Sequence, residues 1–235
     1  MNVALLLAGG VDPNFQLTVP KQFVNVNNRP IITYTMEVFQ NHPDIDYIVI
    51  SCLEGWQELV RAYAMQFNIT KLKWIVQGGV RGQDSSYNGV MALKDECKPD
   101  DMVIIHDSIR PMVSEELITD SIITCRKYGM GVSALCSMDT IMRSSDGRTG
   151  VESISRYEVM RVQTPQTYRF DLLYQAHQSA KEKGIKGQVD TNSMISKLGK
   201  KIYFSKGSEL NIKINTIEDV EMFKVLYNIN LVQED

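Results

Sequence analysis

Glycine and lysine residues near the N-terminus form a pattern that suits phosphate binding. Gly9 and Gly10 follow the apolar stretch 3–8, and Lys21 comes a short loop later, directly after Pro20. Glycines at the end of a buried strand let backbone N–H groups approach an anion, and a nearby lysine adds a positive charge. The pattern predicts a phosphate-binding loop here, with a tight turn and a solvated lysine as the alternative.

A carboxylate ends the apolar stretch 101–105 and is a candidate metal ligand. Asp107 at a strand end can reach both Mg²⁺ and phosphate oxygens. A helix cap or an ion pair with Arg110 is the alternative. We expect the adjacent His106 to be a structural, hydrogen-bonded residue rather than a catalyst. Lys213 lies inside a short apolar stretch, so its side chain must point either to solvent or to an anion.

The elements around these residues alternate as in an α/β protein. Strands are predicted at 3–8, 46–52, 71–76, 101–105 and 131–136, and helices at 30–39, 56–67, 84–94 and 114–128. Near-continuous Val, Ile and Leu in the strands predicts a parallel sheet with helices on both faces. Ligands of such sheets bind at the carboxyl ends of the strands, where Gly9, Asp107 and a second glycine pair, Gly78-Gly79, all fall.

The alternation lapses after residue 136. Residues 137–163 carry a turn and scattered polar residues, which predicts an excursion from the sheet in the form of a hairpin arm. Helices at 171–183 and 192–198, strands at 201–205 and 211–215, and a closing helix from residue 216 are predicted after it. No repeat or linker interrupts the chain, so we expect one domain, 1–235, with an arm.

Bulk composition narrows the function classes. The 235 residues carry a net charge of -3, so we expect neither a nucleic-acid partner nor a membrane partner, and local charges must hold any anionic ligand. The first apolar run is too short for a signal peptide and lacks a basic flank. Four widely spaced cysteines have no metal-binding spacing and are expected to be reduced thiols in a cytoplasmic protein. They are Cys52, Cys97, Cys125 and Cys136.

Several longer motifs together resemble one family of enzymes. They are LLLAGG and PKQF near the N-terminus, HDSIRP at 106–111, Asp139-Thr140, SRYEVMRVQTPQTYR at 155–169, and NIKINTIEDV at 211–220. In this order and at this spacing they resemble the cytidylyltransferases that make CDP-polyols from CTP and a polyol phosphate. Two branches match, one acting on ribitol 5-phosphate and the other on 2-C-methyl-D-erythritol 4-phosphate. The resemblance covers essentially the whole chain.

The resemblance implies a fold and a set of site residues. The fold is a Rossmann-like, mostly parallel sheet of the nucleotidyltransferase (GT-A-like) type with a protruding β-arm. The nucleotide would contact Ala8, Gly9, Gly10, Gly79, Val80 and Ser85; Lys21 and Lys213 would hold the reacting phosphate; Arg110, Thr140 and Arg156 would bind the polyol phosphate; and Asp107 would bind Mg²⁺. Residues 138–162 would form an arm that reaches the neighbouring subunit's site, which implies a homodimer. Catalysis would rest on positioning and on cations, because an ionised phosphate needs no strong general base.

The glycine-rich loop departs from the family pattern. Asn14 stands where the family has an arginine that holds the triphosphate, and Asp12 stands where it has a glycine. Arg81 precedes the position, Gly82 here, at which a second arginine is expected. These departures keep open a relative that binds nucleotide without turnover. A sugar-1-phosphate nucleotidyltransferase is a further alternative, against which HDSIRP and NIKI argue.

The AGG form of the loop and Ser108 favour the ribitol 5-phosphate branch. The absence of a lysine directly after Asp139-Thr140 favours it as well. The motifs QTPQ and NIKI occur in both branches, so 2-C-methyl-D-erythritol 4-phosphate remains the alternative acceptor.

Overall fold

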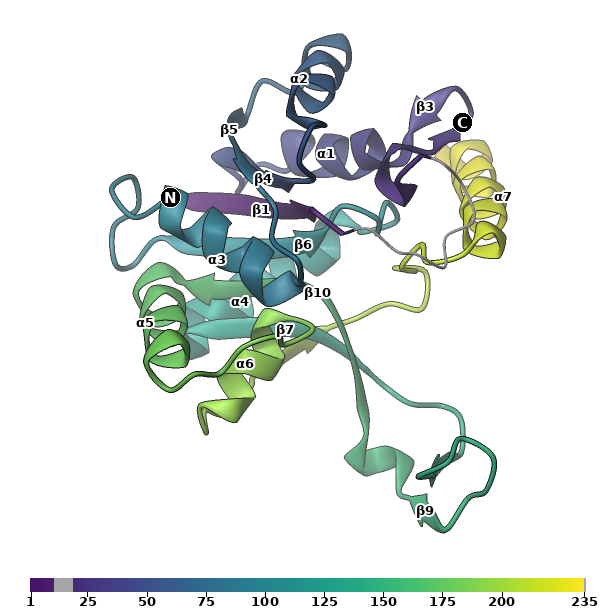
Figure 1. Cartoon of the computed structure of the whole chain (residues 1–235). Helices are drawn as coiled ribbons and strands as arrows, with labels where there is room; N and C mark the ends of the chain where they lie inside the picture. Colours follow the sequence, from purple (N-terminus) through teal and green to yellow (C-terminus); the bar gives the residue numbers. More distant parts are fainter. Residues whose placement is uncertain (11–18, 235) are drawn as a thin grey trace.

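The computed structural model describes residues 1–10 and 19–234 and is built on a seven-stranded sheet (Figure 1). The strands lie in the order β11-β7-β10-β6-β1-β4-β5. They are β1 Asn2–Ala8, β4 Tyr47–Cys52, β5 Leu72–Gln77, β6 Met102–Asp107, β7 Met130–Cys136, β10 Met160–Arg169 and β11 Phe204–Lys206. Only β10 within this sheet pairs in the antiparallel sense, with β6 and β7. The predicted mostly parallel sheet is confirmed.

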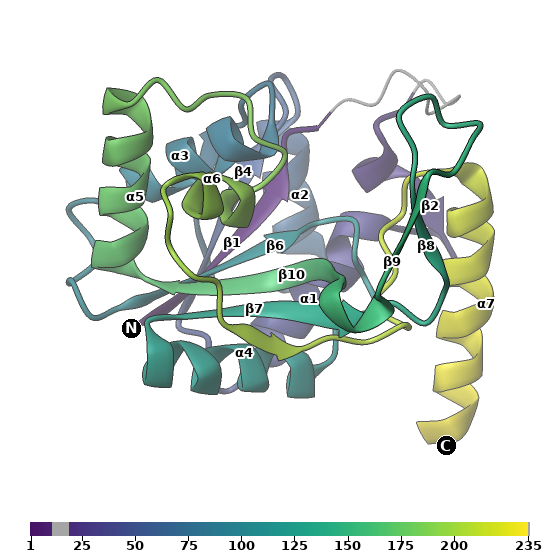
Figure 2. The same cartoon turned by 90° about the horizontal axis from the view of Figure 1, so that it is seen from below.

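Helices cover both faces of the sheet, as Figure 2 shows from below. One face carries α1 Ile31–Asn41, α2 Gln57–Gln66 and α4 Glu115–Tyr128, and the other carries α3 Gly82–Ala92, α5 Phe170–Glu182 and α6 Thr191–Lys197. Successive strand residues point to opposite faces. Ala4 and Leu6 of β1 therefore join the first core, whereas Val3 and Leu5 join the second.

A third apolar cluster attaches the closing helix, α7 Ile217–Glu234. Phe223 of α7 is fully buried, and its ring meets the ring of Tyr34 of α1 edge-on with the centroids 5.1 Å apart. The small hairpin of β2 Asn25–Val26 and β3 Arg29–Pro30 packs in the same cluster through Val26. This packing fixes the segment that leads into α7, and that segment carries Lys213.

Strand β10 corrects the predicted order of elements. The sequence pattern placed residues 137–163 outside the sheet and led directly to a helix, whereas β10 runs through the centre of the sheet. Its polar residues and Pro165 hid it, because proline is disfavoured in central strands. The sheet accommodates Pro165 through an interruption of the pairing with β7 between Val162 and Gln166.

Two smaller predictions were also wrong. Residues 211–215 form no strand, although the N–H of Ile214 donates to the carbonyl oxygen of Ile109 at 2.9 Å. Helix α3 starts at Gly82, and Asp84 in its first turn accepts a hydrogen bond from the N–H of Arg81 instead of capping a later start. The N-cap of α4 is Ser114, at the predicted start of that helix.

The predicted hairpin arm is present and projects from the ends of β7 and β10 (Figure 1). It contains β8 Ile141–Arg143, paired antiparallel with β9 Glu152–Ile154, and the short helix η2 Arg156–Glu158. Large apolar side chains on it are exposed, with Met138 at 73% and Tyr157 at 80%. An isolated two-stranded hairpin is only marginally stable in water.

All four cysteines are free, as predicted. Among the residues that the structure describes, no helix is both long and apolar enough to cross a membrane.

Candidate active site

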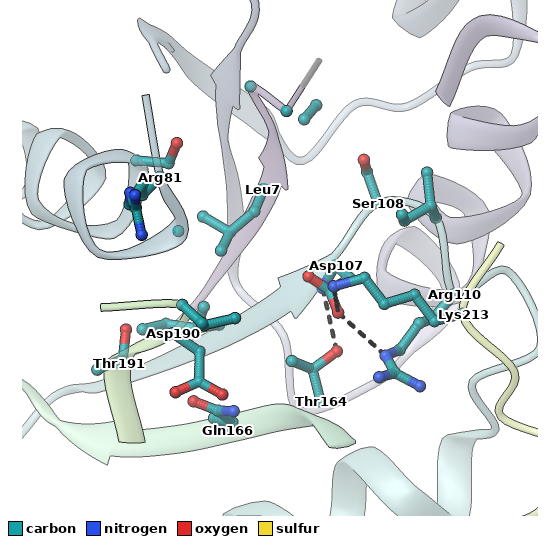
Figure 3. A pocket seen from close by; sticks show the side chains of 18 of the residues that line it. Leu7, Arg81, Asp107, Ser108, Arg110, Thr164, Gln166, Asp190, Thr191 and Lys213 are labelled. Atoms are coloured by element: carbon teal, nitrogen blue, oxygen red, sulfur yellow. Dashed lines mark hydrogen bonds and ion pairs between the residues drawn. The ribbon is translucent and has the colours of Figure 1, made fainter. Parts of the chain in front are cut away.

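A cavity of about 330 Å³ opens at the carboxyl ends of β1 and β6 (Figure 3). Parallel strands bring their carboxyl ends to one edge of the sheet, and the loops that follow leave a crevice there. Of the residues predicted for the site, those that line this cavity are Ala8, Gly9, Gly10, Lys21, Gly79, Val80, Ser85, Asp107, Arg110 and Lys213. The predicted strand ends therefore line one cavity.

The two glycine pairs pack against each other at the cavity wall. A Cβ on Gly78 would lie 2.7 Å from the Cα of Gly9, and a Cβ on Gly9 would lie 2.9 Å from the Cα of Gly78. These two positions need glycine for contact between the loops. A Cβ on Gly10 would meet no atom of the described residues within 4 Å. The described part of the chain therefore leaves space at residue 10 for a ligand that approaches the backbone.

Asp107 lies between two cations. Its Oδ2 is 3.0 Å from Nε of Arg110 and 3.1 Å from Nζ of Lys213. Burial acts to raise the pKa of Asp107, but Lys213 and Arg110 outweigh it and hold the pKa well below the ordinary range. Asp107 is therefore an anion at every physiological pH. The sequence offered two roles for Asp107, a metal ligand and an ion-pair partner of Arg110. The geometry is compatible with both, because the ion pair with Arg110 leaves one carboxylate oxygen for other contacts.

The two cations beside Asp107 differ in their freedom. Arg110 is buried, and its Nη1 also donates to the carbonyl oxygen of Asn211 at 2.8 Å. Lys213 has a side chain that is 36% exposed. Arg110 is therefore fixed in its ion pair with Asp107, whereas the more exposed ammonium group of Lys213 can contact a ligand in the cavity. Lys21 also lines the cavity and donates to Oδ1 of Asn215 at 3.2 Å.

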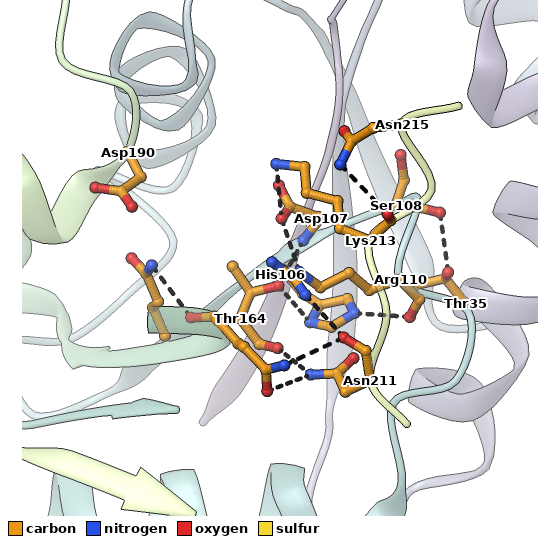
Figure 4. A network of polar contacts seen from close by, with 12 residues as sticks. Thr35, His106, Asp107, Ser108, Arg110, Thr164, Asp190, Asn211, Lys213 and Asn215 are labelled. Carbon is orange, nitrogen blue, oxygen red and sulfur yellow. Dashed lines mark hydrogen bonds and ion pairs between the residues drawn. The ribbon is translucent and has the colours of Figure 1, made fainter. Parts of the chain in front are cut away.

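His106 is a structural residue, as predicted (Figure 4). Its Nε2 lies 3.2 Å from the carbonyl oxygen of Arg110, which can only accept, so Nε2 carries the proton. Nδ1 then accepts from the hydroxyl of Thr164 at 3.0 Å, and the same hydroxyl oxygen accepts from the N–H of Asp107 at 3.1 Å. Burial lowers the pKa of His106 to about 4, so the ring is neutral. This network orients Asp107.

Helix α3 builds the opposite wall. The N–H of Gly79 donates to Oγ of Ser85 at 3.0 Å, which closes the loop between β5 and α3. Arg81 points to the neighbouring loop, where its Nη1 donates to the carbonyl oxygen of Gly187 at 3.0 Å. A Cβ on Gly82 would lie 2.2 Å from the carbonyl oxygen of Val189, so glycine is required for this contact.

A buried polar chain leads away from that wall. The hydroxyl of Thr191 donates to Oγ of Ser86 at 3.0 Å, and Oγ of Ser86 lies 3.1 Å from Nε2 of His177. Burial lowers the pKa of His177 to about 4, and the neutral ring accepts from Ser86. These hydrogen bonds join α3, α5 and α6 behind the cavity.

The structure does not bring the other three predicted site residues into this cavity, two because they lie on the arm and one because it is not described. Thr140 and Arg156 lie on the arm and do not line the cavity of their own chain. Asn14, like Asp12, lies outside the described residues. Sequence reasoning gave no role to several residues that do line the cavity: Gln163, Thr164, Gln166, Asp190 and Thr191. The first three belong to the QTPQ motif, which was the available signal.

Fold and site together define an α/β protein with a polar, cation-rich cavity at the strand ends, the arrangement of a nucleotide-binding transferase. The family model described as "IspD: 2-C-methyl-D-erythritol 4-phosphate cytidylyltransferase" matches residues 2–227. The chain belongs to this family, and it is a nucleotidyltransferase.

Individual relatives cover nearly the whole chain. The ribitol-5-phosphate cytidylyltransferase of Lacticaseibacillus paracasei is 42% identical over 95% of this chain and 97% of its own. The 2-C-methyl-D-erythritol 4-phosphate cytidylyltransferase of Clostridium botulinum (strain Langeland) is 33% identical over 93% of this chain and 94% of its own.

Solved structures share the fold. The 4-diphosphocytidyl-2C-methyl-D-erythritol synthase of Anaerococcus prevotii superposes with a TM-score of 0.82 at 22% identity, covering 97% of this chain and 98% of its own. The Francisella tularensis 2-C-methyl-D-erythritol 4-phosphate cytidylyltransferase gives a TM-score of 0.78 at 26% identity, covering 94% of this chain and 97% of its own.

Proposed function

We propose that this chain transfers the cytidylyl group of CTP to ribitol 5-phosphate and forms CDP-ribitol and pyrophosphate. The observation that carries the proposed reaction is the position of Asp107 between Lys213 and Arg110, in a cavity that Lys21 also lines. The 42% identity to a ribitol-5-phosphate cytidylyltransferase supports the choice of acceptor.

The reaction forms one bond and breaks one. A phosphate oxygen of ribitol 5-phosphate attacks the α-phosphorus of CTP, and the bond from that phosphorus to the bridging oxygen of the β-phosphate breaks in line, so pyrophosphate leaves. In the proposed site Lys213 and Lys21 neutralise the charge that grows on the α-phosphate oxygens, and Gly10 lets the phosphates approach the backbone. The attacking oxygen is already ionised, so no general base is required.

Mg²⁺ fits the residues that are present. Asp107 supplies the hard anionic oxygen that Mg²⁺ prefers, and among the described residues no group of three or more His, Cys, Asp or Glu side chains forms an all-protein metal cage. We infer that Asp107 would hold the ion. When bound, the ion would supply positive charge to the phosphate groups of CTP.

The arm supplies the remaining residues in this proposal. Thr140 and Arg156 project from the body on the hairpin and would reach the cavity of a second copy, with residues 138–162 as the dimer contact. The exposed side chains of Met138 and Tyr157 support this assignment, because an apolar surface of this kind is stabilised when a partner covers it.

Pyrophosphate release is the direct test. The purified protein is incubated with CTP and Mg²⁺, and with either ribitol 5-phosphate or 2-C-methyl-D-erythritol 4-phosphate. We expect faster release with ribitol 5-phosphate. A higher kcat/KM with 2-C-methyl-D-erythritol 4-phosphate would identify that compound as the acceptor instead. The similarity to the Clostridium botulinum relative supports this alternative.

Asn14 in place of an arginine favours a second candidate, a nucleotide-binding relative without turnover. Calorimetry separates the two functions: CTP binding without pyrophosphate release from either acceptor supports the second candidate, and turnover excludes it.

A further inference from the structure

Residues 207–216 bring Lys213 to the cavity without forming a helix or a strand. They follow β11, which pairs with β7 as far as Lys206, and they lead into α7. The later part of this segment is held by Ile214, which is fully buried in the cluster around α7. A segment outside the sheet must satisfy its polar backbone groups by other means. The contacts that hold the part before Lys213 therefore decide where its ammonium group lies.

The side chain of Gln163 holds that earlier part against β10. Its Oε1 accepts from the N–H of Ser208 at 3.1 Å, and its Nε2 donates to the carbonyl oxygen of Ser208 at 2.9 Å. One amide thus pairs with both backbone groups of one residue, as a residue of a neighbouring strand would. The pairing also fixes the orientation of the amide, because only its oxygen can accept from an N–H and only its nitrogen can donate to a carbonyl.

Asn211 makes a second link from the same segment to β10 (Figure 4). Its Nδ2 donates to the carbonyl oxygen of Thr164 at 2.7 Å, and the hydroxyl oxygen of Thr164 accepts from the N–H of Asp107. Residues 163 and 164 of β10 thus hold the segment before Lys213 as well as the backbone of Asp107. The two charged groups that they align are in contact, since Nζ of Lys213 lies 3.1 Å from Oδ2 of Asp107.

We propose that Gln163 is a positioning residue of this site, whose amide fixes residues 207–212 so that the ammonium group of Lys213 lies at the cavity. The role rests on the proposed function, in which Lys213 neutralises charge on the α-phosphate. Direct contact of Gln163 with the reactants is the competing role, because the residue itself lines the cavity. The two roles differ in one respect: a positioning residue has nothing left to position once Lys213 is removed.

Gln83 provides a matched control. Its Oε1 accepts from the N–H of Gln188 at 2.9 Å, and its Nε2 donates to the carbonyl oxygen of Ile185 at 2.8 Å, so it makes the same kind of backbone pairing. These partners lie in the segment before α6, not in the segment that carries Lys213. Gln163→Met and Gln83→Met each keep the length of the side chain and remove two hydrogen bonds. Both should lower the melting temperature, by about 2–8 °C.

A double-mutant cycle with Lys213→Ala separates positioning from direct contact. Pyrophosphate release is measured for the wild type, both single variants and the double variant. We expect Gln163→Met to lower kcat about 10–100-fold when Lys213 is present, the effect of a small displacement of a catalytic group, and to cause no further loss when Lys213 is alanine. Gln83→Met should change kcat by one and the same factor in both backgrounds. An equal factor for Gln163→Met in the two backgrounds, including no loss in either, would overturn the proposal.

Chemical labelling of Lys213 gives a readout that does not depend on turnover. The ligand-free proteins are treated with a limiting amount of acetic anhydride, and acetylation of Lys213 is followed by mass spectrometry. We expect Lys213 to react several-fold faster in Gln163→Met than in the wild type, because its ammonium group leaves Asp107 more often, and at the wild-type rate in Gln83→Met. An unchanged rate in Gln163→Met would overturn the proposal. If the wild type turns over neither acceptor, the proposed function fails, but the labelling still tests Gln163.

Discussion

The cavity and the arm carry the predicted site residues in opposite ways. Asp107 in the cavity has a side chain that is 17% exposed, and its carboxylate, its backbone N–H and its neighbour His106 all have partners from distant parts of the chain. Arg156 on the arm is exposed, and its Nη1 donates to the carbonyl oxygen of Met138, which lies on the same arm. The cavity is therefore preorganised by the fold of one chain, whereas the arm lacks a surface to position its residues. The proposed active site needs both.

Loss of a cavity cation should have the largest effect. Lys213→Ala removes the exposed cation beside Asp107 and should lower kcat by about 10²–10³-fold, because one preorganised donor to the transition state is lost. Pyrophosphate release measures the loss. Lys206→Ala is the control, because Lys206 pairs with Glu116 on the surface. Equal rates for the two variants would contradict the role of Lys213.

Loss of Arg156 on the arm should reduce activity as much as the loss of Lys213 or less, and it should leave the cavity unchanged. Arg156→Ala should raise the KM for the acceptor and reduce kcat/KM by about 10²-fold, since a charged contact to its phosphate is removed. Arg148→Ala, which changes an exposed arginine in the turn of the same arm, is the control. An unchanged KM in Arg156→Ala would exclude it from the acceptor site.

A mixture of two inactive variants tests whether the arm acts on the partner subunit. Lys213→Ala has an intact arm and Arg156→Ala has an intact cavity, so a mixed dimer contains one complete site. After subunit exchange, about a quarter of the wild-type rate should return, since half of the dimers are mixed and half of their sites are complete. No recovery in dimers shown to be mixed would mean that the arm does not serve a neighbouring cavity.

Glycine substitutions divide the cavity wall into a structural and a ligand-facing part. Gly10→Ala should leave the melting temperature unchanged and raise the KM for CTP about tenfold, because its methyl group would meet none of the described residues within 4 Å and, in the proposed site, would face the ligand. Gly9→Ala should lower the melting temperature, because its Cβ would lie 2.9 Å from the Cα of Gly78. A reversed pattern would mean that the open space at Gly10 is not where the phosphates lie.

Acid should weaken the cavity wall and leave the arm's local contacts unaffected. His106 and His177 are buried neutral with pKa values lowered to about 4, while the unfolded chain binds protons near pH 6.5. Between these values the unfolded state holds more protons, so the free energy of unfolding falls as pH falls. The loss from pH 7 to pH 5 should be on the order of 2 kcal/mol per histidine. Urea unfolding at the two pH values measures it, and equal values would contradict the neutral, buried state.

Much of the sheet and most of the cavity follow from the sequence alone. Runs such as residues 3–8 and 101–105 alternate with amphipathic helices, and parallel strands place their carboxyl ends at one edge, so Gly9, Gly79 and Asp107 had to meet. Lys213 was also predictable as a residue facing away from the core, because Ile212 and Ile214 on either side of it pack in the cluster around α7.

Other features depended on the tertiary structure. β10 is recognised as a strand only through its pairing with β6 and β7, since Pro165 and polar neighbours mask its local pattern. The Thr164 hydroxyl accepts from the Asp107 backbone N–H across 57 residues of sequence. The physical reason is range. Strand and helix periodicity can be read from residues that are adjacent in the sequence. Strand pairing and long-range hydrogen bonds depend on segments that only the completed fold brings together.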